Sequence, residues 1–382
     1  MIERGLKHLV KRLLSEYPAL ALVGARQSGK TTLARSFDGT YFDLEQDADR
    51  LRLDLKWKAL TEDDRLIILD EAQSWPEIFP RLRGTIDSDR KRAGRFLLLG
   101  SVSPSLMVQV SESLAGRLSV LELTPFLLTE LPDVPLEEVW HVGGFPDGGV
   151  LGSARYPRWQ LDYLTLLAQR DLPNWGLPAK GRVTERLFRM VAAVHGQIWN
   201  ATKIGQSLGL SYQTVNGYMD YLEGAFLVRR LQPYLVNLRK RLIRSPKVYW
   251  RDTGLLHALL QTADGNDLMN KPWVGASWEG FVIEQILSSL ARSGRHGQGY
   301  FFRTSDRHEI DLVLDMGDRP WAIEIKLTAN PISDDMKRLN KAADMIGAGY
   351  RILITQTSQC HAEGDRISCS LPWLLSRIEQ MV

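Results

Sequence analysis

Cysteine is scarce in this chain of 382 residues, which contains only Cys360 and Cys369. Two cysteines cannot build a disulfide framework, and neither has partners at the spacing that zinc sites use. The sequence therefore predicts a protein that folds without disulfides or structural zinc, as expected for a reduced cytoplasm.

Long apolar runs are also missing, since no stretch approaches the ~18 consecutive apolar residues of a membrane-spanning helix. Residues 1–14 lack the apolar core and the cleavage site of a secretory signal. Their apolar residues instead recur at helical spacing, as Ile2, Leu6, Leu9, Val10 and Leu13. We expect a helix packed on the first domain, with a membrane-surface helix as the alternative. A cytoplasmic location without a membrane partner follows from this interpretation.

The formal charge of +3 is small, so it permits nucleic-acid binding without arguing for it. The length allows roughly two or three domains of ordinary size. No internal repeat or low-complexity linker divides the chain, but three blocks differ in pattern. We place them at residues 1–128, 129–250 and 251–382.

Short apolar runs in the first block alternate with helical patterns, which is typical of a parallel α/β sheet with buried strands. The predicted strands are Leu20–Val23, Thr40–Leu44, Arg65–Leu69, Arg95–Leu99 and Leu118–Leu123. The second block is mostly helical apart from a Gly/Pro-rich loop over His141–Gly152. The third block mixes helices with strands predicted at Tyr300–Phe302, Ile310–Leu314, Trp321–Ile325 and Arg351–Ile354.

A phosphate-binding loop follows the first predicted strand and precedes a helical pattern, which is the required context for GxxxxGK[ST]. In such a loop the backbone amides point at phosphate oxygens, the lysine neutralises the β and γ charges, and the threonine hydroxyl binds Mg²⁺. The nucleotide-binding residues are Gly24, Ala25, Arg26, Gln27, Ser28, Gly29, Lys30, Thr31 and Thr32. The sequence predicts an ATP site, since it contains no guanine-reading Asn/Thr-Lys-x-Asp motif.

An apolar strand ends in two carboxylates at Asp70 and Glu71, as a Walker B element does. Asp70 would hold the Mg²⁺ shell together with Thr31, and Glu71 would polarise the attacking water. Ser101, after the next buried strand, occupies the position of a γ-phosphate sensor, although a helix or turn cap is the alternative. Arg117 is the candidate arginine finger, which would act in a neighbouring subunit; a structural arginine paired with a carboxylate is the alternative.

Residues 202–222 in the middle block read as a helix, a glycine turn and a second helix with Ser211 as its N-cap. A strand starting at Phe226 would begin the wing of a winged helix. The exposed positions of the second helix would face a DNA major groove, namely Ser211, Tyr212, Gln213, Thr214 and Asn216. Basic residues downstream could contact phosphates, with a solvated charge run as the alternative: Arg239, Lys240, Arg241, Arg244 and Lys247. A structural or protein-binding module is the alternative.

A β-hairpin with a two-residue turn at Gly317 and Asp318 is predicted in the third block. Counting outward from that turn places Asp311 opposite Glu324 and Glu309 opposite Lys326, on one face of the hairpin. Cβ atoms of residues directly opposite each other lie about 5 Å apart, so two carboxylates there repel each other unless a cation lies between them. Asp311 and Glu324 are therefore predicted ligands of Mg²⁺ or Mn²⁺, with Lys326 activating a water for phosphodiester attack.

This D…ExK arrangement resembles that of the PD-(D/E)XK nucleases. The resemblance implies a further carboxylate from a preceding helix, for which Glu279 is the candidate metal ligand. The alternative is that the fold persists as a binding module without cleavage activity.

The whole chain resembles prokaryotic AAA-type ATPases that join a P-loop domain and a winged helix to a C-terminal domain of unknown function with a nuclease-like fold. The matching segments are residues 24–32, 69–73, 112–117, 143–146, 246–255 and 324–326. The resemblance implies an α/β multidomain architecture: an AAA-type parallel-sheet domain, a helical and winged-helix domain, and a restriction-endonuclease-like α/β domain. It also implies ATP hydrolysis and a connection to DNA.

We therefore expect an oligomeric, Mg²⁺-dependent ATPase that binds and remodels or translocates DNA, with nuclease activity as an open question. The partners would be DNA and further copies of the chain, arranged in a ring if Arg117 acts between subunits. The alternative is a nucleotide-dependent switch or protein remodeller that keeps the nuclease-like domain for assembly.

Overall fold

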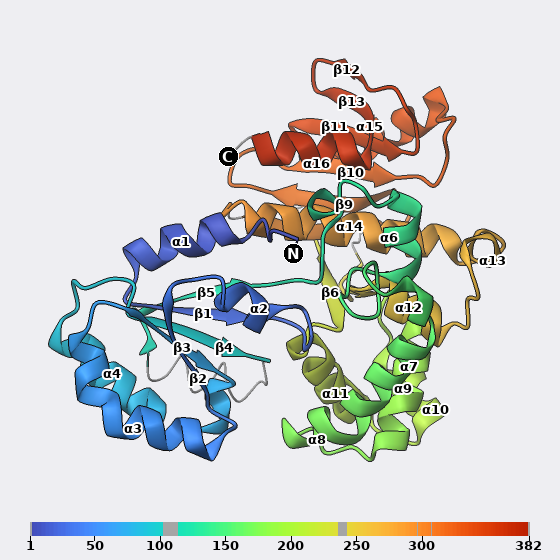
Figure 1. Ribbon diagram of the computed structural model, residues 1–382. Helices are drawn as coiled ribbons and strands as arrows, with labels where there is room; N and C mark the ends of the chain where they lie inside the picture. Colours follow the sequence, from blue (N-terminus) through green and yellow to red (C-terminus); the bar gives the residue numbers. More distant parts are fainter. Residues whose placement is uncertain (1, 102–113, 236–242, 296, 307, 381–382) are drawn as a thin grey trace. The chain divides into compact units, whose positions relative to one another are not determined.

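The computed structural model describes residues 2–101, 114–235, 243–295, 297–306 and 308–380 (Figure 1). The chain divides into two compact units. Unit 1 contains residues 1–126 together with the short segments 174–177 and 224–226. Unit 2 contains residues 127–173, 178–223 and 227–382.

Unit 1 is built on a five-stranded parallel sheet with the order β2-β3-β4-β1-β5. All five strands lie where the apolar runs predict them. Their bounds are β1 Ala19–Val23, β2 Gly39–Asp43, β3 Leu66–Asp70, β4 Phe96–Gly100 and β5 Leu118–Glu122. The helices between them are α1 Lys7–Glu16, α2 Lys30–Ala34, α3 Asp47–Glu62, η1 Ala72–Ser74 and α4 Ile78–Ser88.

Helices cover both faces of this sheet, as Figure 1 shows for α2 on one side and α3 and α4 on the other. Successive residues of a strand point to opposite faces, so β1 contributes Leu20 to one apolar cluster and Ala21 to the other. The predicted N-terminal helix is confirmed as α1, whose buried residues Leu9 and Val10 join the first cluster. Burial on both faces explains why the inner strands β1, β3 and β4 read as apolar runs, whereas the edge strands β2 and β5 are mostly half-buried.

Unit 2 begins with a helical region and ends with a mixed α/β region. Its helices are η2 Leu128–Glu130, α6 Leu136–Val142, η3 Ser153–Arg155, α7 Arg158–Leu166, η4 Leu167–Asp171, α8 Leu172–Asn174, α9 Gly181–Ala193, α10 Ala201–Leu208, α11 Tyr212–Gly224, α12 Thr253–Leu259, α13 Gly265–Met269, α14 Val274–Arg292, α15 Ser333–Ile346 and α16 Leu371–Gln380. The loop predicted at 141–152 begins two residues later than expected, because α6 continues to Val142 and is capped by Gly143. Within the described ranges, no helix combines the length and the apolar character that crossing a membrane takes.

The predicted helix-turn-helix is formed by α10 and α11. Gly209 ends α10 in the left-handed conformation, with φ of 70°, and the Ser211 hydroxyl accepts the amide hydrogen of Thr214 at 3.1 Å. Val215 and Leu222 are fully buried in the core beneath α11. The following strand, β6, begins at Val228 rather than Phe226, because Phe226 has φ of 59°, which no strand accommodates.

An eight-stranded mixed sheet runs through unit 2 in the order β12-β13-β11-β10-β9-β8-β6-β7. Its strands are β6 Val228–Pro233, β7 Lys247–Trp250, β8 Gln298–Arg303, β9 Glu309–Asp315, β10 Trp321–Ile325, β11 Tyr350–Thr355, β12 His361–Glu363 and β13 Arg366–Ser370. The antiparallel pair β6 and β7 follows α11, as a wing would, but β6 also pairs with β8 and so belongs to the larger sheet.

The hairpin of β9 and β10 has the predicted register, since Leu312 pairs with Ile323 and the next positions outward are Asp311 and Glu324. The prediction of a two-residue turn at Gly317 and Asp318 is wrong. Pairing stops at Leu314 and Trp321, so a longer connection joins the strands. Pro320 has no amide hydrogen to donate to the ladder, which prevents the strands from pairing up to the glycine.

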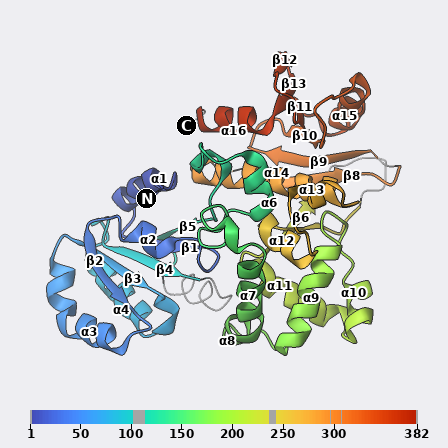
Figure 2. The ribbon, with the colours of Figure 1, turned by 45° about the vertical axis from the view of Figure 1, so that its right-hand side comes forward.

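Helices α14 and α15 lie on opposite sides of strand β9 in both ribbon views (Figures 1 and 2). Helix α14 contacts the neighbouring strands through the buried Glu284. The Glu284 carboxylate accepts hydrogen bonds from Arg229 of β6 at 2.9 Å and from Arg251, just after β7, at 2.6 Å. Burial alone would raise the pKa of Glu284, but the two guanidinium charges outweigh it and lower the pKa to about 2.

Glu284→Gln tests this ion-pair cluster. A lowered pKa in the folded state contributes stability above the ordinary pKa of 4.5, and that contribution is lost as the pH falls towards about 2. We expect Glu284→Gln to lower the free energy of unfolding by ~3 kcal/mol at neutral pH, with a deficit that shrinks between those two pH values. Urea unfolding at a series of pH values measures both quantities.

The exposed Glu137 of α6 provides the control, because Glu137→Gln removes a carboxylate from the same unit without touching Arg229 or Arg251. Equal unfolding midpoints for Glu284→Gln and the unchanged protein at neutral pH would contradict the proposed role of the cluster.

Candidate active site

The loop between β1 and α2 has the backbone conformation that a phosphate-binding loop requires. Gly24 has φ of 146°, and a Cβ atom there would lie 2.2 Å from the carbonyl oxygen of Leu123. Gly29 has φ of 96° and caps the start of α2, so the first amides of that helix point into the loop. Only glycine fits the close approach at residue 24. Because the loop directly follows β1, its residues 24–32 lie at the carboxyl edge of the sheet.

The ammonium group of Lys30 is buried inside this loop and donates to the carbonyl oxygens of Gly24 at 3.0 Å and Ala25 at 2.9 Å. Burial lowers the pKa of Lys30 to about 8, although the charges of Glu71 and Asp70 act in the opposite direction. An anionic ligand beside the ammonium group would raise that pKa again, because an opposite charge favours the protonated form. Lys30 is therefore positioned for an anion.

The carboxylate of Asp70 lies at the end of β3, next to the P-loop helix. Its Oδ2 atom accepts hydrogen bonds from the hydroxyl groups of Thr31 and Tyr41, both at 2.7 Å. A hydroxyl and a carboxylate oxygen in contact are the donor types that Mg²⁺ prefers. The donor set of Thr31 and Asp70 thus fits the predicted magnesium pair.

Glu71 adopts a left-handed backbone conformation with φ of 48°, which is rare for a residue with a side chain and recurs at functional sites. Its carboxylate accepts a hydrogen bond from the side-chain amide of Gln73, and burial raises its pKa. Ser101 is buried directly after β4, the strand between β3 and β1. Strand order therefore brings Lys30, Asp70, Glu71 and Ser101 to one edge of the sheet.

Arg117 lies outside this group and forms a bidentate ion pair with Asp87 of α4. Its Nε atom is 2.8 Å from one carboxylate oxygen and its Nη2 atom is 2.9 Å from the other. Hydrogen bonds from Arg117 and Arg90 lower the pKa of Asp87 to about 2. Within one chain Arg117 therefore has the structural partner that the alternative interpretation requires.

Two side chains near the loop were not predicted. Tyr41 reaches Asp70 because β2 lies beside β3, and strand order cannot be read from apolar runs. Arg4 is buried and donates to the carbonyl oxygens of Ser28 at 2.8 Å and Thr124 at 2.7 Å, which ties the loop to the chain after β5. An arginine in an amphipathic N-terminal segment gives no signal of such a contact.

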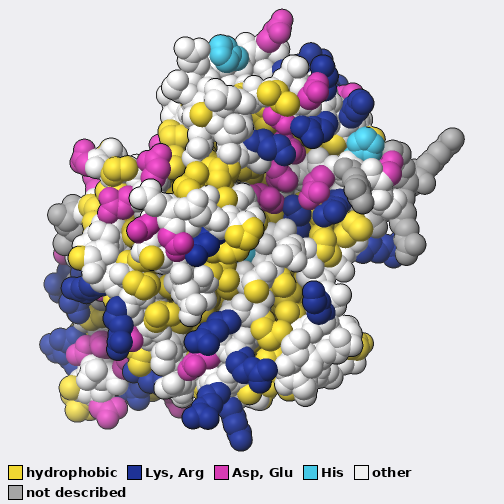
Figure 3. Space-filling view, turned by 90° about the vertical axis from the view of Figure 1, so that its right-hand side faces the viewer, with side chains coloured by type: hydrophobic (Ala, Val, Ile, Leu, Met, Phe, Trp, Pro, Cys, Tyr) yellow, Lys and Arg dark blue, Asp and Glu magenta, His cyan; other side chains and the backbone are white. Residues whose placement is uncertain are grey.

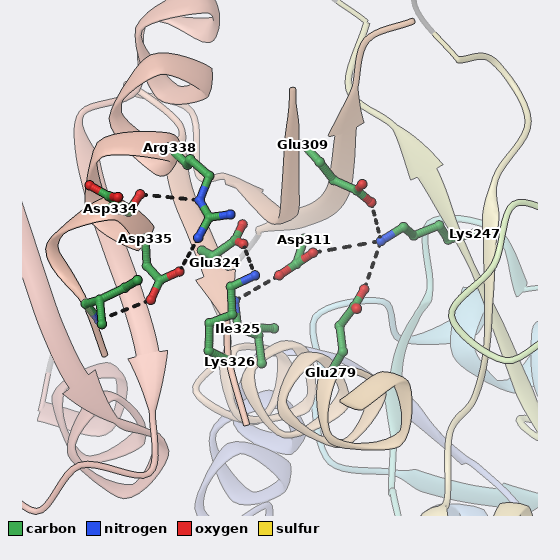
Figure 4. Close-up of polar contacts among 11 residues, drawn as sticks. Lys247, Glu279, Glu309, Asp311, Glu324, Ile325, Lys326, Asp334, Asp335 and Arg338 are labelled. Atoms are coloured by element: carbon green, nitrogen blue, oxygen red, sulfur yellow. Dashed lines mark hydrogen bonds and ion pairs between the residues drawn. The ribbon is translucent and has the colours of Figure 1, made fainter. Parts of the chain in front are cut away.

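A second group of charged side chains lies on the C-terminal sheet, as Figure 4 shows. The hairpin supplies Glu309 and Asp311 from β9 and Glu324 from β10, and α14 supplies Glu279. Lys326 pairs with Glu324 at 2.7 Å, and the buried Lys247 of β7 lies among the other three carboxylates. Lys247 was expected in a basic, DNA-facing group, and that expectation is wrong because the side chain is enclosed by this cluster.

The metal assignment of Asp311, Glu324 and Glu279 stays a prediction for these ligands. The structure does bring the carboxylates together as the hairpin register requires. Within the described ranges, however, no set of three His, Cys, Asp or Glu side chains is arranged to hold a metal ion. The remaining predicted DNA contacts Arg239, Lys240 and Arg241 lie outside the described residues, while Arg244 is exposed.

Gly24→Ala tests the geometry of the P-loop. The added methyl group would meet the Leu123 carbonyl, so we expect the loop to be displaced, ATP affinity to fall at least about tenfold, and the protein to lose roughly 1–3 kcal/mol of stability. Gly84→Ala in α4 is the matched control, since nothing lies within 4 Å of its Cβ position. Fluorescent-nucleotide titration and urea unfolding measure the two effects; unchanged nucleotide affinity in Gly24→Ala would contradict the loop geometry.

Three family models match the chain, each over a different segment. Residues 16–131 match the family model of an AAA domain. Residues 134–266 and 274–374 match two domains of unknown function, DUF8612 and DUF4143. The Walker-type ATPase paby2304 of Pyrococcus abyssi is 15% identical, and the match covers 68% of this chain and 96% of that protein with a TM-score of 0.46.

Two curated relatives are the uncharacterized proteins Rv2008c of Mycobacterium tuberculosis and Mb2031c of Mycobacterium bovis. Each is 39% identical over 334 residues, which cover 86% of this chain and 75% of the relative. The AAA match and the P-loop together identify the N-terminal unit as an AAA-type ATPase domain. The chain thus belongs to the family of these two mycobacterial proteins, with an AAA domain followed by DUF8612 and DUF4143 domains.

Proposed function

We propose that the chain is an oligomeric, Mg²⁺-dependent ATPase that uses hydrolysis to remodel or translocate DNA. The observation that carries the ATPase part is the contact of Thr31 with Asp70 beside the buried Lys30. This contact unites the two sequence elements that all P-loop ATPases combine, a phosphate cradle and an acidic strand end.

Each predicted residue of the nucleotide site in unit 1 then has a defined role. The amides of residues 24–32 and the ammonium group of Lys30 bind the β- and γ-phosphates. Thr31 and Asp70 hold Mg²⁺, which neutralises charge on the phosphates. Glu71 orients and polarises the attacking water, and Ser101 donates to the γ-phosphate. The raised pKa of Glu71 supports this role, since a stronger base accepts a proton more readily.

The helix-turn-helix supports the DNA part of the proposal. Ser211, Tyr212 and Gln213 are exposed at the start of α11, where recognition helices contact base edges. Asn216 is less available, because its side-chain oxygen accepts from the indole of Trp199 at 2.8 Å. On the face drawn in Figure 3, Lys and Arg side chains form separate groups with acidic residues between them. DNA contact would therefore depend on individual exposed cations such as Arg244.

Oligomerisation is proposed on account of Arg117, which would have to exchange Asp87 for the nucleotide of a neighbouring subunit to act as a finger. Because Asp87 is exposed, breaking its ion pair with Arg117 costs little free energy, as exposed ion pairs contribute little to stability. The C-terminal region is assigned DNA or protein binding rather than cleavage, since Lys247 and Lys326 already pair with its acidic side chains.

The runner-up is a nucleotide-dependent switch or remodeller of proteins, in which α10 and α11 serve only assembly. The enclosure of Lys247 among Glu279, Glu309 and Asp311, which removes one cation from the predicted phosphate-contacting group, favours it. The two functions differ in whether DNA changes the ATPase rate.

Steady-state ATP hydrolysis should rise when duplex, single-stranded or branched DNA is added, and the increase should weaken with salt. Gln213→Ala should reduce both DNA affinity and stimulation, by roughly 1–3 kcal/mol in binding if the side chain reads a base. Gln206→Ala, an exposed glutamine on α10, is the matched control and should leave both unchanged.

Rates that are indifferent to every DNA form, with basal hydrolysis intact, would reject the DNA part and favour the protein remodeller. Equal losses in Gln213→Ala and Gln206→Ala would show that α11 does not present a reading surface.

A further inference from the structure

The acidic cluster of the C-terminal sheet is organised around the side chain of Lys247. Its Nζ atom lies 2.9 Å from Glu279, 2.9 Å from Glu309 and 3.9 Å from Asp311 (Figure 4). The side chain is buried, with 3% of the residue exposed. An ammonium group so enclosed keeps its charge only where carboxylates replace the water it has lost.

The partners of Lys247 are held in place from several elements. Glu279, on α14, also accepts a hydrogen bond from the Tyr249 hydroxyl at 2.5 Å, so residues 247 and 249 of β7 contact the same carboxylate oxygen. Asp311 accepts the amide hydrogen of Ile325 at 2.9 Å through its other oxygen. Because Tyr249 and Trp250 are core residues, β7 cannot withdraw Lys247 without disrupting the sheet.

A divalent metal ion does not fit this arrangement. Mg²⁺ requires oxygen ligands at 2.0–2.1 Å in octahedral geometry and keeps several waters. Each predicted ligand already faces an ammonium group, since Lys247 lies 2.9 Å from Glu279 and 3.9 Å from Asp311. The third ligand, Glu324, lies 2.7 Å from Lys326. A metal ion bound there would repel the ammonium group in a poorly solvated site.

We propose that the ε-ammonium group of Lys247 is the resident cation of this cluster and takes the place of the divalent metal ion that the D…ExK pattern predicts. Glu279, Glu309 and Asp311 then serve to join β7, α14 and β9 through one internal charge. The C-terminal region accordingly binds its partner without a metal ion at these residues. This inference stands independently of ATP hydrolysis in unit 1.

Manganese binding to the full-length protein, followed by electron paramagnetic resonance without nucleotide, tests the proposal. The unchanged protein and Asp311→Asn should bind equal amounts of Mn²⁺, because Asp311 is not a ligand while Lys247 is present. Lys247→Met keeps the length of the side chain but removes its charge. It should gain one Mn²⁺ site, which Lys247→Met/Asp311→Asn should lose.

Lys326→Met is the matched control, since it removes the neighbouring lysine and leaves Lys247 in place; it should gain no site. Thermal unfolding gives a second readout. Lys247→Met should melt at a lower temperature than the unchanged protein in EDTA, and Mn²⁺ should raise the melting temperature more in this variant than in the unchanged protein.

An Mn²⁺ site in the unchanged protein that Asp311→Asn abolishes would overturn the proposal. So would a Lys247→Met variant that keeps the far-ultraviolet circular dichroism of the unchanged protein but gains no Asp311-dependent site. If Lys247→Met does not fold, the comparison of the unchanged protein with Asp311→Asn still decides the question.

Discussion

The contact between the Thr31 hydroxyl and the Asp70 carboxylate is the interaction on which the nucleotide site depends. It joins the helix after the P-loop to the end of β3, although 39 residues separate the two side chains. The parallel sheet makes this meeting possible, because the carboxyl ends of its strands all open at one edge. Tyr41 donates to the same carboxylate oxygen and so adds a third element, β2, to the arrangement.

The two charged sites of the chain balance their electrostatics in opposite ways. Unit 1 collects donors, namely loop amides and the ammonium group of Lys30, and so is suited to bind an external anion. The C-terminal sheet of unit 2 collects carboxylates and satisfies them with the chain's own Lys247 and Lys326. The first site therefore needs a ligand to complete it, whereas the second is closed by internal ion pairs.

Features set by local pattern could be predicted from the sequence. The inner strands β1, β3 and β4 of unit 1 were predictable because burial on both faces makes them largely apolar. The register of Asp311 opposite Glu324 followed from alternation along the hairpin. Features set by tertiary contacts could not. Lys247 lies 32 residues from Glu279 and reads as part of a basic run, and Arg4 gives no sign of its contact with Ser28. The exposed strand His361–Glu363 lacks the apolar alternation that would have revealed it.

The rate of ATP hydrolysis by Lys30→Ala, compared with the unchanged protein at saturating Mg²⁺ and ATP, tests the central claim most directly. If the buried ammonium group holds the β- and γ-phosphates, the rate should fall by at least ~10²-fold. The melting temperature should stay close to that of the unchanged protein, since the hydrogen bonds that Lys30 donates to described residues go to carbonyl groups of its own loop. A folded Lys30→Ala variant that hydrolyses ATP at the original rate would contradict the account.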